Sequence, residues 1–244
     1  MDAPIDRLPG FRRRFRITPA PGVVRTEVED DYHRMRVTVR HDGSVATAIE
    51  PELIRAPWTT CPGAVEQVTK TFTGVALDGF AERVEEKTHN CTHLYDLALL
   101  AGAHAHDRDP LTYDILVSDP VDGVARAELR LNGTPVLAWS YAGFKIVEPA
   151  YLAGTSLEKM RTWIDTLDPA TQEAARILRW GSFLAHGRVL PMEKQSDARR
   201  MPPNCYTFQP QRAVLAKRVG VIRDFSKGGA QPLDPIQMHD RSTA

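Results

Sequence analysis

Three dipeptides constrain the fold of this chain more than any other feature of its sequence. Asp42-Gly43, Asp122-Gly123 and Asn132-Gly133 each separate two segments in which apolar and polar residues alternate. The central positions of a short hairpin turn favour a positive φ, which glycine, asparagine and aspartate adopt more readily than other residues. Each dipeptide therefore predicts a tight turn between two antiparallel strands.

The alternation extends beyond these turns and predicts two antiparallel meanders, over residues 11–50 and 113–141. Apolar residues two apart mark the strands, because successive side chains of a strand point to opposite faces. The first meander is marked by Val23, Val24, Met35, Val37, Val39, Val45 and Ile49, and the second comprises 113–117, 124–129 and 136–141. Residues 51–60, with two prolines, are expected to form a loop. The second meander has no histidine or cysteine, so we expect its role to be structural.

Helical periodicity follows each of two cysteines. Pro62, directly after Cys61, suits the first position of a helix, and an apolar face with a spacing of three or four residues comes next. A second apolar face with the same period follows Cys91. The two faces consist of Ala64, Val65, Val68 and Phe72, and of Leu94, Leu97, Leu100 and Ala101. A further helical segment is expected between them, from about Leu77, and another over residues 155–187.

These elements predict the α+β class, with antiparallel meanders and helices packed on them. We expect a flexible arm over residues 1–10, a single α+β domain over 11–200 and a C-terminal extension over 201–244. Within the domain, residues 11–106 form the half with the candidate site, 107–150 an antiparallel sheet and 151–190 a helical part. The last 20 residues are polar and are expected to add little to the core.

Composition restricts the function classes. The chain has 31 Lys and Arg and 31 Asp and Glu, whereas a nucleic-acid-binding protein needs a surplus of basic residues. The basic run at residues 12–16 is expected to be a solvated strand face. No apolar run approaches the roughly 20 residues of a membrane helix, and the N-terminus does not resemble a signal peptide. With only three cysteines, we expect a cytoplasmic protein with reduced thiols that acts on a small molecule, without nucleic-acid or membrane partners.

The candidate site consists of Asp31, His33, Cys61, Cys91 and His93. Each cysteine precedes a predicted helix, where the helix dipole favours the thiolate that attacks electrophiles or binds metal. Thiolate, imidazole and carboxylate ligands suit zinc or iron(II), and dispersed ligands are typical of catalytic sites with an open coordination position. We therefore expect these five residues to hold a divalent metal, with His93 and Cys61 in catalytic roles.

Other interpretations of the same residues stay open. A buried cysteine is often a small apolar core residue. This interpretation is favoured for Cys205, and for Cys61 it is as good as a functional role. His104 and His106 are expected to be solvated, and His186 to lie at a helix end. If no metal binds, Cys61 could act as a nucleophile with a histidine as its base.

Three segments resemble a bacterial family that is catalogued as a domain of unknown function. They are RAPWTTCPGA at 55–64, CTHLYDL at 91–97 and DPVDG at 119–123. The resemblance covers nearly the whole chain and carries no assigned activity. Because members of the family occur in proteobacteria with wide catabolic repertoires, it implies a small organic or aromatic substrate.

Residues 31–105 are also distantly similar to the U-type iron–sulfur cluster assembly scaffold. The order is shared: a strand meander with two ligands, a DG hairpin, a cysteine before a helix and a last cysteine at another helix start. Cys61 and Cys91 match the two helix-start cysteines, and Asp31 and His33 stand where that family has cysteine and aspartate. The resemblance implies a related core fold with a metal pocket at this place.

The leading hypothesis is a metal-dependent lyase, isomerase or hydrolase that acts on a small organic acid or aromatic compound. The alternatives are an accessory protein of iron–sulfur assembly or sulfur relay, a metal-free thiol enzyme and a binding module in which both cysteines belong to the core.

Overall fold

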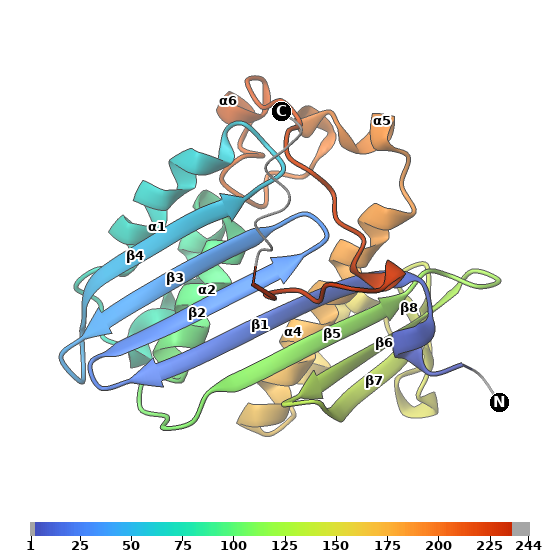
Figure 1. The fold of residues 1–244 in the computed structure, drawn as a ribbon, viewed down its shortest axis with the longest axis horizontal. Coiled ribbons are helices and arrows are strands. Elements are labelled where there is room, and N and C mark those ends of the chain that lie inside the picture. The colour runs from blue at the N-terminus through green and yellow to red at the C-terminus, as the bar shows by residue number, and fades with distance from the viewer. Residues whose placement is uncertain (1–2, 236–244) are drawn as a thin grey trace.

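The computed structural model describes residues 3–235 and is built on an antiparallel sheet of eight strands (Figure 1). The strand order is β4-β3-β2-β1-β5-β6-β7-β8. The strands are β1 (Gly10–Ala20), β2 (Val23–Asp30), β3 (Arg34–His41), β4 (Ala46–Arg55), β5 (Leu111–Ser118), β6 (Val124–Leu131), β7 (Thr134–Ala142) and β8 (Lys145–Glu148). The predicted α+β class with antiparallel strands and helices is therefore confirmed, while a relation to the iron–sulfur scaffold fold stays a prediction.

The two predicted meanders are halves of one sheet. β1 pairs with β2 on one side and with β5 on the other, so that Phe15 is opposite both Val28 and Tyr113. Alternation along the sequence shows that strands exist, but it does not specify which edge strands of two meanders meet. The long β1 makes this junction, and it places residues from both halves of the chain around one core.

Helices cover one face of the sheet, where α1, α2 and α4 lie behind the strands in Figure 1. The α-helices are α1 (Ala64–Phe72), α2 (Thr92–Ala103), α3 (Arg161–Ile164), α4 (Pro169–Ala185), α5 (Met192–Gln195) and α6 (Pro210–Ala213). Short 3-10 helices occupy Ile5–Arg7, Cys61–Gly63, Asp78–His89, Ala150–Leu152, Leu157–Lys159, His186–Arg188, Ala198–Arg200 and Phe225–Lys227. Among residues 3–235, no helix is both long and apolar enough to cross a membrane.

The core lies between the sheet and these helices. Its sheet side is formed by alternate residues of the central strands, Phe11, Phe15, Ile17, Met35, Val37 and Val39. α2 is joined to β2 by a buried hydrogen bond in which the Thr26 hydroxyl donates to the Leu97 carbonyl over 2.9 Å. α4 approaches β5 closely at Gly181, where an added Cβ would lie 2.6 Å from Cγ2 of Ile115. A glycine is therefore needed for this contact between helix and sheet.

The opposite face of the sheet is crossed by the end of the described chain (Figure 1). Arg14 of β1 donates to the Pro232 carbonyl, and the Leu233 amide donates to Glu29 of β2 over 2.8 Å. Phe225 and Leu233 are buried here. This part of the last 20 residues does add to the core, contrary to the expectation for the tail; residues 236–244 of that tail lie outside the described part of the chain.

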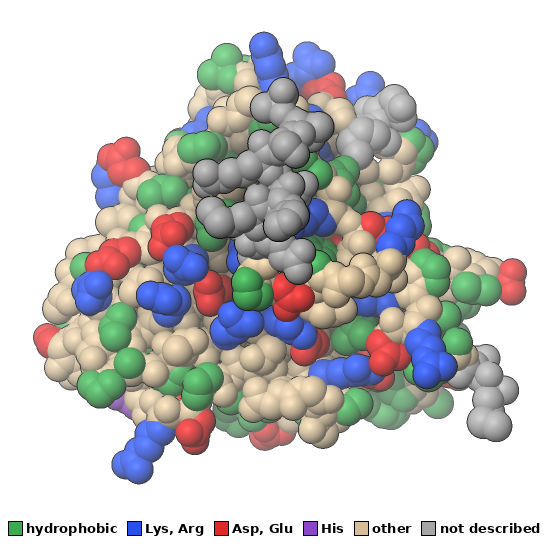
Figure 2. Space-filling model, in the orientation of Figure 1, with side chains coloured by type: hydrophobic (Ala, Val, Ile, Leu, Met, Phe, Trp, Pro, Cys, Tyr) green, Lys and Arg blue, Asp and Glu red, His purple; other side chains and the backbone are tan. Residues whose placement is uncertain are grey.

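Charged side chains of both signs are interleaved over the same face (Figure 2). They form cross-strand ion pairs, such as those of Arg36 with Glu27 and Glu52. The basic run at residues 12–16 differs from the expected solvated face, because Arg12 and Arg13 are almost completely buried. The strand alternation explains the burial of Arg13, which points toward the helices. Arg12 points to the open face and is buried there by the N-terminal segment, whose Ile5 and Leu8 carbonyls accept its hydrogen bonds.

Two further expectations are corrected. The segment 51–60 is not a loop throughout, since β4 continues to Arg55 and Pro51 lies within it, opposite Val37. The N-terminal residues that the structure describes are held in place rather than loose: Ile5 is buried, and the Arg12 guanidinium donates to the carbonyls of Ile5 and Leu8.

Candidate functional site

A cavity of about 300 Å³ lies on the helix side, near the turn between β2 and β3. Its walls come from distant parts of the chain: the β2–β3 turn, the starts of the 3-10 helix at Cys61 and of α2, the end of α4, and the segment 201–208. Aromatic side chains form much of the lining, namely Tyr32, Trp58, Trp180, Phe183, Tyr206 and Phe208. This volume and lining are typical of a pocket for a small, largely apolar molecule.

The turn between β2 and β3 orients His33 in this cavity. Oδ1 of Asp30 accepts hydrogen bonds from the backbone amides of Tyr32 and His33, each over 2.8 Å. The Asp30 amide in turn donates to the His33 carbonyl. Aspartate commonly closes such turns by bonding to amides two and three residues on. The turn therefore brings the His33 ring back to Asp30, with Nδ1 3.0 Å from Oδ1.

Asp30 is an ionised carboxylate that contacts His33 of the cavity lining but does not itself line the cavity. It is completely buried, and its second oxygen accepts from the guanidinium of Arg13, which is opposite Asp30 in the β1–β2 register. Burial alone would raise the pKa of this carboxyl, but His33 and Arg13 together hold it well below its usual range. With four donors around it, Asp30 can orient His33 and fix the proton on Nδ1.

His93, the second residue of α2, stacks on His33. The ring centroids are 3.9 Å apart, and the planes are inclined by 27°. Burial, followed by the charges of His33 and Arg13, lowers the pKa of His93 well below its usual value, so His93 is neutral. Its Nε2 is buried and has no hydrogen-bond partner among residues 3–235. A buried nitrogen without a partner is costly, which indicates a place for a ligand atom, a water molecule or an ion.

The structure thus brings together two of the five predicted site residues, His33 and His93, with Asp30 as the carboxylate. Their ligand atoms lie within 4.8 Å of one another, and no other such group of three or more occurs in the described chain. Asp31 points away, and its Oδ2 accepts from Arg188 over 2.6 Å. Successive residues at a strand end point in opposite directions, so a shift of one residue separates Asp31 from the histidines. Metal binding itself stays a prediction.

Asp31 belongs to a separate ionic network on the other side of the strand end. Its partner Arg188 also bonds to Asp119 over 2.9 Å and to Asp224 over 3.3 Å. Burial raises the pKa of Asp31 to about 7 despite the adjacent guanidinium. This network ties the end of the helical layer to the end of β5 and to the C-terminal segment. It accounts for Oδ2 of Asp31, whereas Oδ1 is buried without a hydrogen-bond partner in the described chain.

Cys61, Cys91 and Cys205 all line the cavity, yet none joins the group of potential ligands in the described chain. The Cys61 sulfur is 3.4 Å from the Thr207 hydroxyl, in a small apolar cluster with Trp58. Cys91 belongs to the main core, and its sulfur is 4.0 Å from that of Met35. Cys61 and Cys91 thus line the same cavity, but each packs in a different apolar cluster.

The expected ease of thiol ionisation is not found. Burial raises the pKa of Cys61, and it raises that of Cys91 to about 12 and that of Cys205 to about 11. Desolvation of the thiolate therefore outweighs the dipole of a following helix. For Cys61 the helix dipole is weaker still, because α1 begins only at Ala64, three residues after the cysteine.

His104, which the sequence predicts to be solvated, instead lies between two carboxylates. Nδ1 and Nε2 of His104 lie 2.6 Å from Asp107 and 2.9 Å from Glu173, respectively. Although partial burial opposes it, contact with Glu173 and Asp107 raises the pKa of His104 to about 9. This contact joins the end of α2 to α4 and lies outside the cavity.

The sequence interpretation missed several residues of the site. Arg13 could have been found, since it occupies an inward position in an otherwise apolar series of Phe11, Phe15 and Ile17. Asp30 could have been found as the neighbour of Asp31. Trp180, Phe183, Tyr206, Phe208 and Arg218 come from segments more than 80 residues away from His93, and no local pattern indicates that contact.

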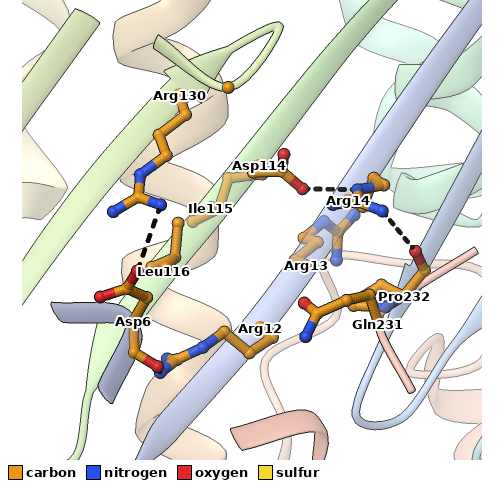
Figure 3. A pocket seen from close by; sticks show the side chains of 11 residues that line it. Asp6, Arg12, Arg13, Arg14, Asp114, Ile115, Leu116, Arg130, Gln231 and Pro232 are labelled. Atoms are coloured by element: carbon orange, nitrogen blue, oxygen red, sulfur yellow. Dashed lines mark hydrogen bonds and ion pairs between the residues drawn. The ribbon is translucent and has the colours of Figure 1, made fainter. Parts of the chain in front are cut away.

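A second hollow, of about 260 Å³, lies on the open face of the sheet (Figure 3). Arginines surround it, but they already have partners: Arg14 is paired with Asp114 over 2.5 Å, and Arg130 is 3.8 Å from Asp6. An anion here would have to displace these carboxylates. The helix-side cavity is therefore the stronger candidate site.

Comparison with known proteins gives one result that bears on this site. A family model described as a protein of unknown function (DUF2889) matches residues 17–106. The match is narrower than the expected resemblance and covers less than half of the chain. It includes His33 and His93 but not Arg13 or the walls contributed after α2. No curated protein matches the chain.

Proposed function

We propose that the chain is an enzyme that binds a small, largely apolar or aromatic molecule in the helix-side cavity and transfers a proton through His33. The observation that supports this function is the buried hydrogen bond to Asp30 from His33, which lines an aromatic cavity. A carboxylate that orients an imidazole is a recurring arrangement for general acid–base catalysis. Isomerases, lyases and hydrolases all require such a step.

The roles of the residues follow from their contacts. Nδ1 of His33 donates to Asp30, so a neutral His33 has its lone pair on Nε2, where it can accept a proton. When His33 takes up that proton, the Asp30 carboxylate stabilises the imidazolium. His93 stays neutral beside it and can donate or accept one hydrogen bond. The aromatic walls strengthen each of these interactions, because apolar side chains lower the local dielectric constant.

A turnover assay tests the proposal. We would incubate the full chain in D₂O with a panel of arylacetic acids, aryl ketones and aryl esters, and follow hydrolysis and deuterium incorporation by NMR and mass spectrometry. His33→Gln should lower the turnover at least a hundredfold, because the base is lost. The matched control is His89→Gln, an exposed residue that does not line the cavity. Turnover that survives His33→Gln, or no turnover with any member of the panel, would count against this function.

The metal hypothesis remains as a second candidate, supported by the three converging ligand atoms of Asp30, His33 and His93 and by the unpartnered Nε2 of His93. Two histidines and one carboxylate are the ligand set of many iron(II) sites. To bind a metal, Asp30 would have to release one of its present donors. Equilibrium dialysis with iron(II) or zinc decides between the candidates: binding of about one equivalent that is lost in His93→Gln and kept in Cys61→Ala supports the metal site.

The iron–sulfur alternative also stays a prediction. An optical spectrum of anaerobically purified protein tests it, because a cluster absorbs in the visible range and a mononuclear zinc site does not. Absence of such a spectrum after reconstitution with iron and sulfide would leave the acid–base enzyme as the better hypothesis.

A further inference from the structure

Arg218 is a cation in the cavity wall that has no anionic partner. It is half-buried and lines the cavity near Cys61 and Tyr32. Within residues 3–235, no carboxylate and no hydrogen-bond acceptor pairs with its guanidinium. Its guanidinium carbon instead lies 5.5 Å from the ring centroid of Tyr32 and 5.3 Å from that of Trp58. The group is therefore held against two aromatic rings, and its N–H donors remain available to a ligand.

The backbone fixes the position of this arginine. Arg218 forms an isolated antiparallel bridge with Trp58. The Thr59 amide donates to the Lys217 carbonyl, and the Val219 amide donates to the Pro57 carbonyl, each over 3.0 Å. Arg218 thus belongs to a short two-stranded connection rather than to a free loop. A cation on a fixed backbone loses little entropy when it binds a ligand.

Arg218 differs from the other partly or fully buried arginines of the described chain in having no acceptor for its guanidinium. Arg13 is paired with Asp30, Arg55 with Glu29 and Arg188 with Asp31. Arg12 and Arg179 have no ion pair but donate to backbone carbonyls. A cation that is removed from water usually has such a partner, because its desolvation is otherwise uncompensated. Arg218 lacks one in the described chain, and burial lowers its pKa. The missing partner can be supplied by a bound molecule.

The lining restricts the charge of that molecule. Arg218 is the only Lys or Arg among the described residues that line the cavity, so the site compensates a single negative charge. A planar guanidinium binds a carboxylate through two parallel hydrogen bonds. The rest of the wall is mostly apolar and aromatic, with room for about one ring in 300 Å³.

We propose that Arg218 binds the carboxylate of the substrate, and that the substrate is therefore a small aromatic carboxylic acid. This inference rests on the proposed function, because it takes the cavity to be the substrate site. The acid group would lie at Arg218, and the ring would lie among Trp180, Phe183 and Tyr206.

Isothermal titration calorimetry with the full chain tests this assignment. The probes are phenylacetate and trans-cinnamate, their neutral amides, and phenyl phosphate. The wild-type protein should bind each acid at least tenfold more tightly than its amide. Arg218→Gln should remove this preference and leave the affinity for the amides unchanged, whereas Arg218→Lys should keep part of it. Lys217→Gln is the matched control, because it removes one positive charge from the adjacent exposed residue and should keep the full preference.

The outcomes separate the two proposals. Amides that bind as tightly as the acids, or a preference that survives Arg218→Gln, would overturn the role of Arg218 but leave the cavity as a binding site. Tighter binding of phenyl phosphate than of either acid would overturn the carboxylate class. If neither acids nor amides bind, both the proposed function and this inference fail. Thermal unfolding of each variant shows whether a lost preference reflects a lost fold.

Discussion

The imidazole rings of His33 and His93 lie nearly parallel, with their centroids 3.9 Å apart. Two positive charges at this distance in a buried place would repel each other strongly, so at most one of the two rings is a positively charged imidazolium. Asp30 contacts His33, whereas Nε2 of His93 has no partner in the described chain. Because burial also lowers the pKa of His93, His93 is the neutral member of the pair.

This assignment predicts how stability depends on pH. The folded-state pKa of His93 is lowered, chiefly by burial, so the unfolded chain binds more protons as the pH falls below about 6.5. The wild-type protein should therefore lose stability relative to His93→Gln between pH 7 and pH 5, by no more than about 1.4 kcal/mol for each pH unit. Urea unfolding of both proteins at several pH values measures this difference. A constant difference would contradict a neutral His93.

The buried ion pair of Arg13 with Asp30 predicts a large loss of stability on removal of its negative charge. Asp30→Asn leaves a buried guanidinium without an anion, which typically costs about 3–5 kcal/mol. Glu50→Gln is the matched control, since Glu50 pairs with Arg40 in solvent, and it should leave the free energy of unfolding nearly unchanged. The two values come from urea unfolding at pH 7. Similar effects of the two substitutions would show that Asp30 does not compensate Arg13.

The raised pKa of His104 predicts that the protein loses stability as the pH becomes alkaline. Its pKa is raised to about 9, so its contribution to stability is complete below pH 6.5 and is lost as the pH rises through 9. The advantage of the wild-type protein over His104→Gln should fall by roughly 1 kcal/mol over this range, because solvent screens part of the interaction. Unfolding experiments at pH 6 and pH 10 provide the comparison, and an advantage that grows with pH would refute the bridge to Glu173.

The raised thiol pKa values predict slow alkylation of the native protein. Iodoacetamide reacts with thiolates, and burial disfavours the thiolate at Cys61, Cys91 and Cys205. At pH 7.5 each cysteine should react at least tenfold more slowly in the folded chain than in urea, as followed by peptide mass spectrometry. Rapid, stoichiometric labelling of Cys61 in the folded chain would instead support the metal-free thiol enzyme.

The local parts of the fold could be predicted from the sequence. Asp122-Gly123 and Asn132-Gly133 have positive φ at both residues, as a two-residue hairpin turn requires. Asp42-Gly43 does connect β3 and β4, but by a longer turn in which Asp42 accepts from the amides of Ser44 and Val45. Helices follow Cys61 and Cys91 as the periodicity indicates.

The site could be predicted only in part, because its residues meet through long-range pairing. His33 and His93 were recognised as chemical groups, but the choice between Asp30 and Asp31 depends on where β2 ends. The ionisation of the cysteines depends on burial, which no spacing reveals. Arg218 reaches the cavity through a bridge to Trp58 that joins positions 160 residues apart, and no local sequence pattern indicates this contact.

The family match begins at residue 17, inside β1, and ends just after α2. A polypeptide cut at these limits would retain both histidines, Asp30, Cys61 and Cys91, but it would lose Arg13, half of the central strand and the partner strand β5. It would have an unpaired sheet edge at β1, and Asp30 would lack the guanidinium that compensates its charge. The folded unit of this chain is therefore larger than the segment that the family model matches, and the cavity walls contributed after α2, including Arg218, lie outside that segment.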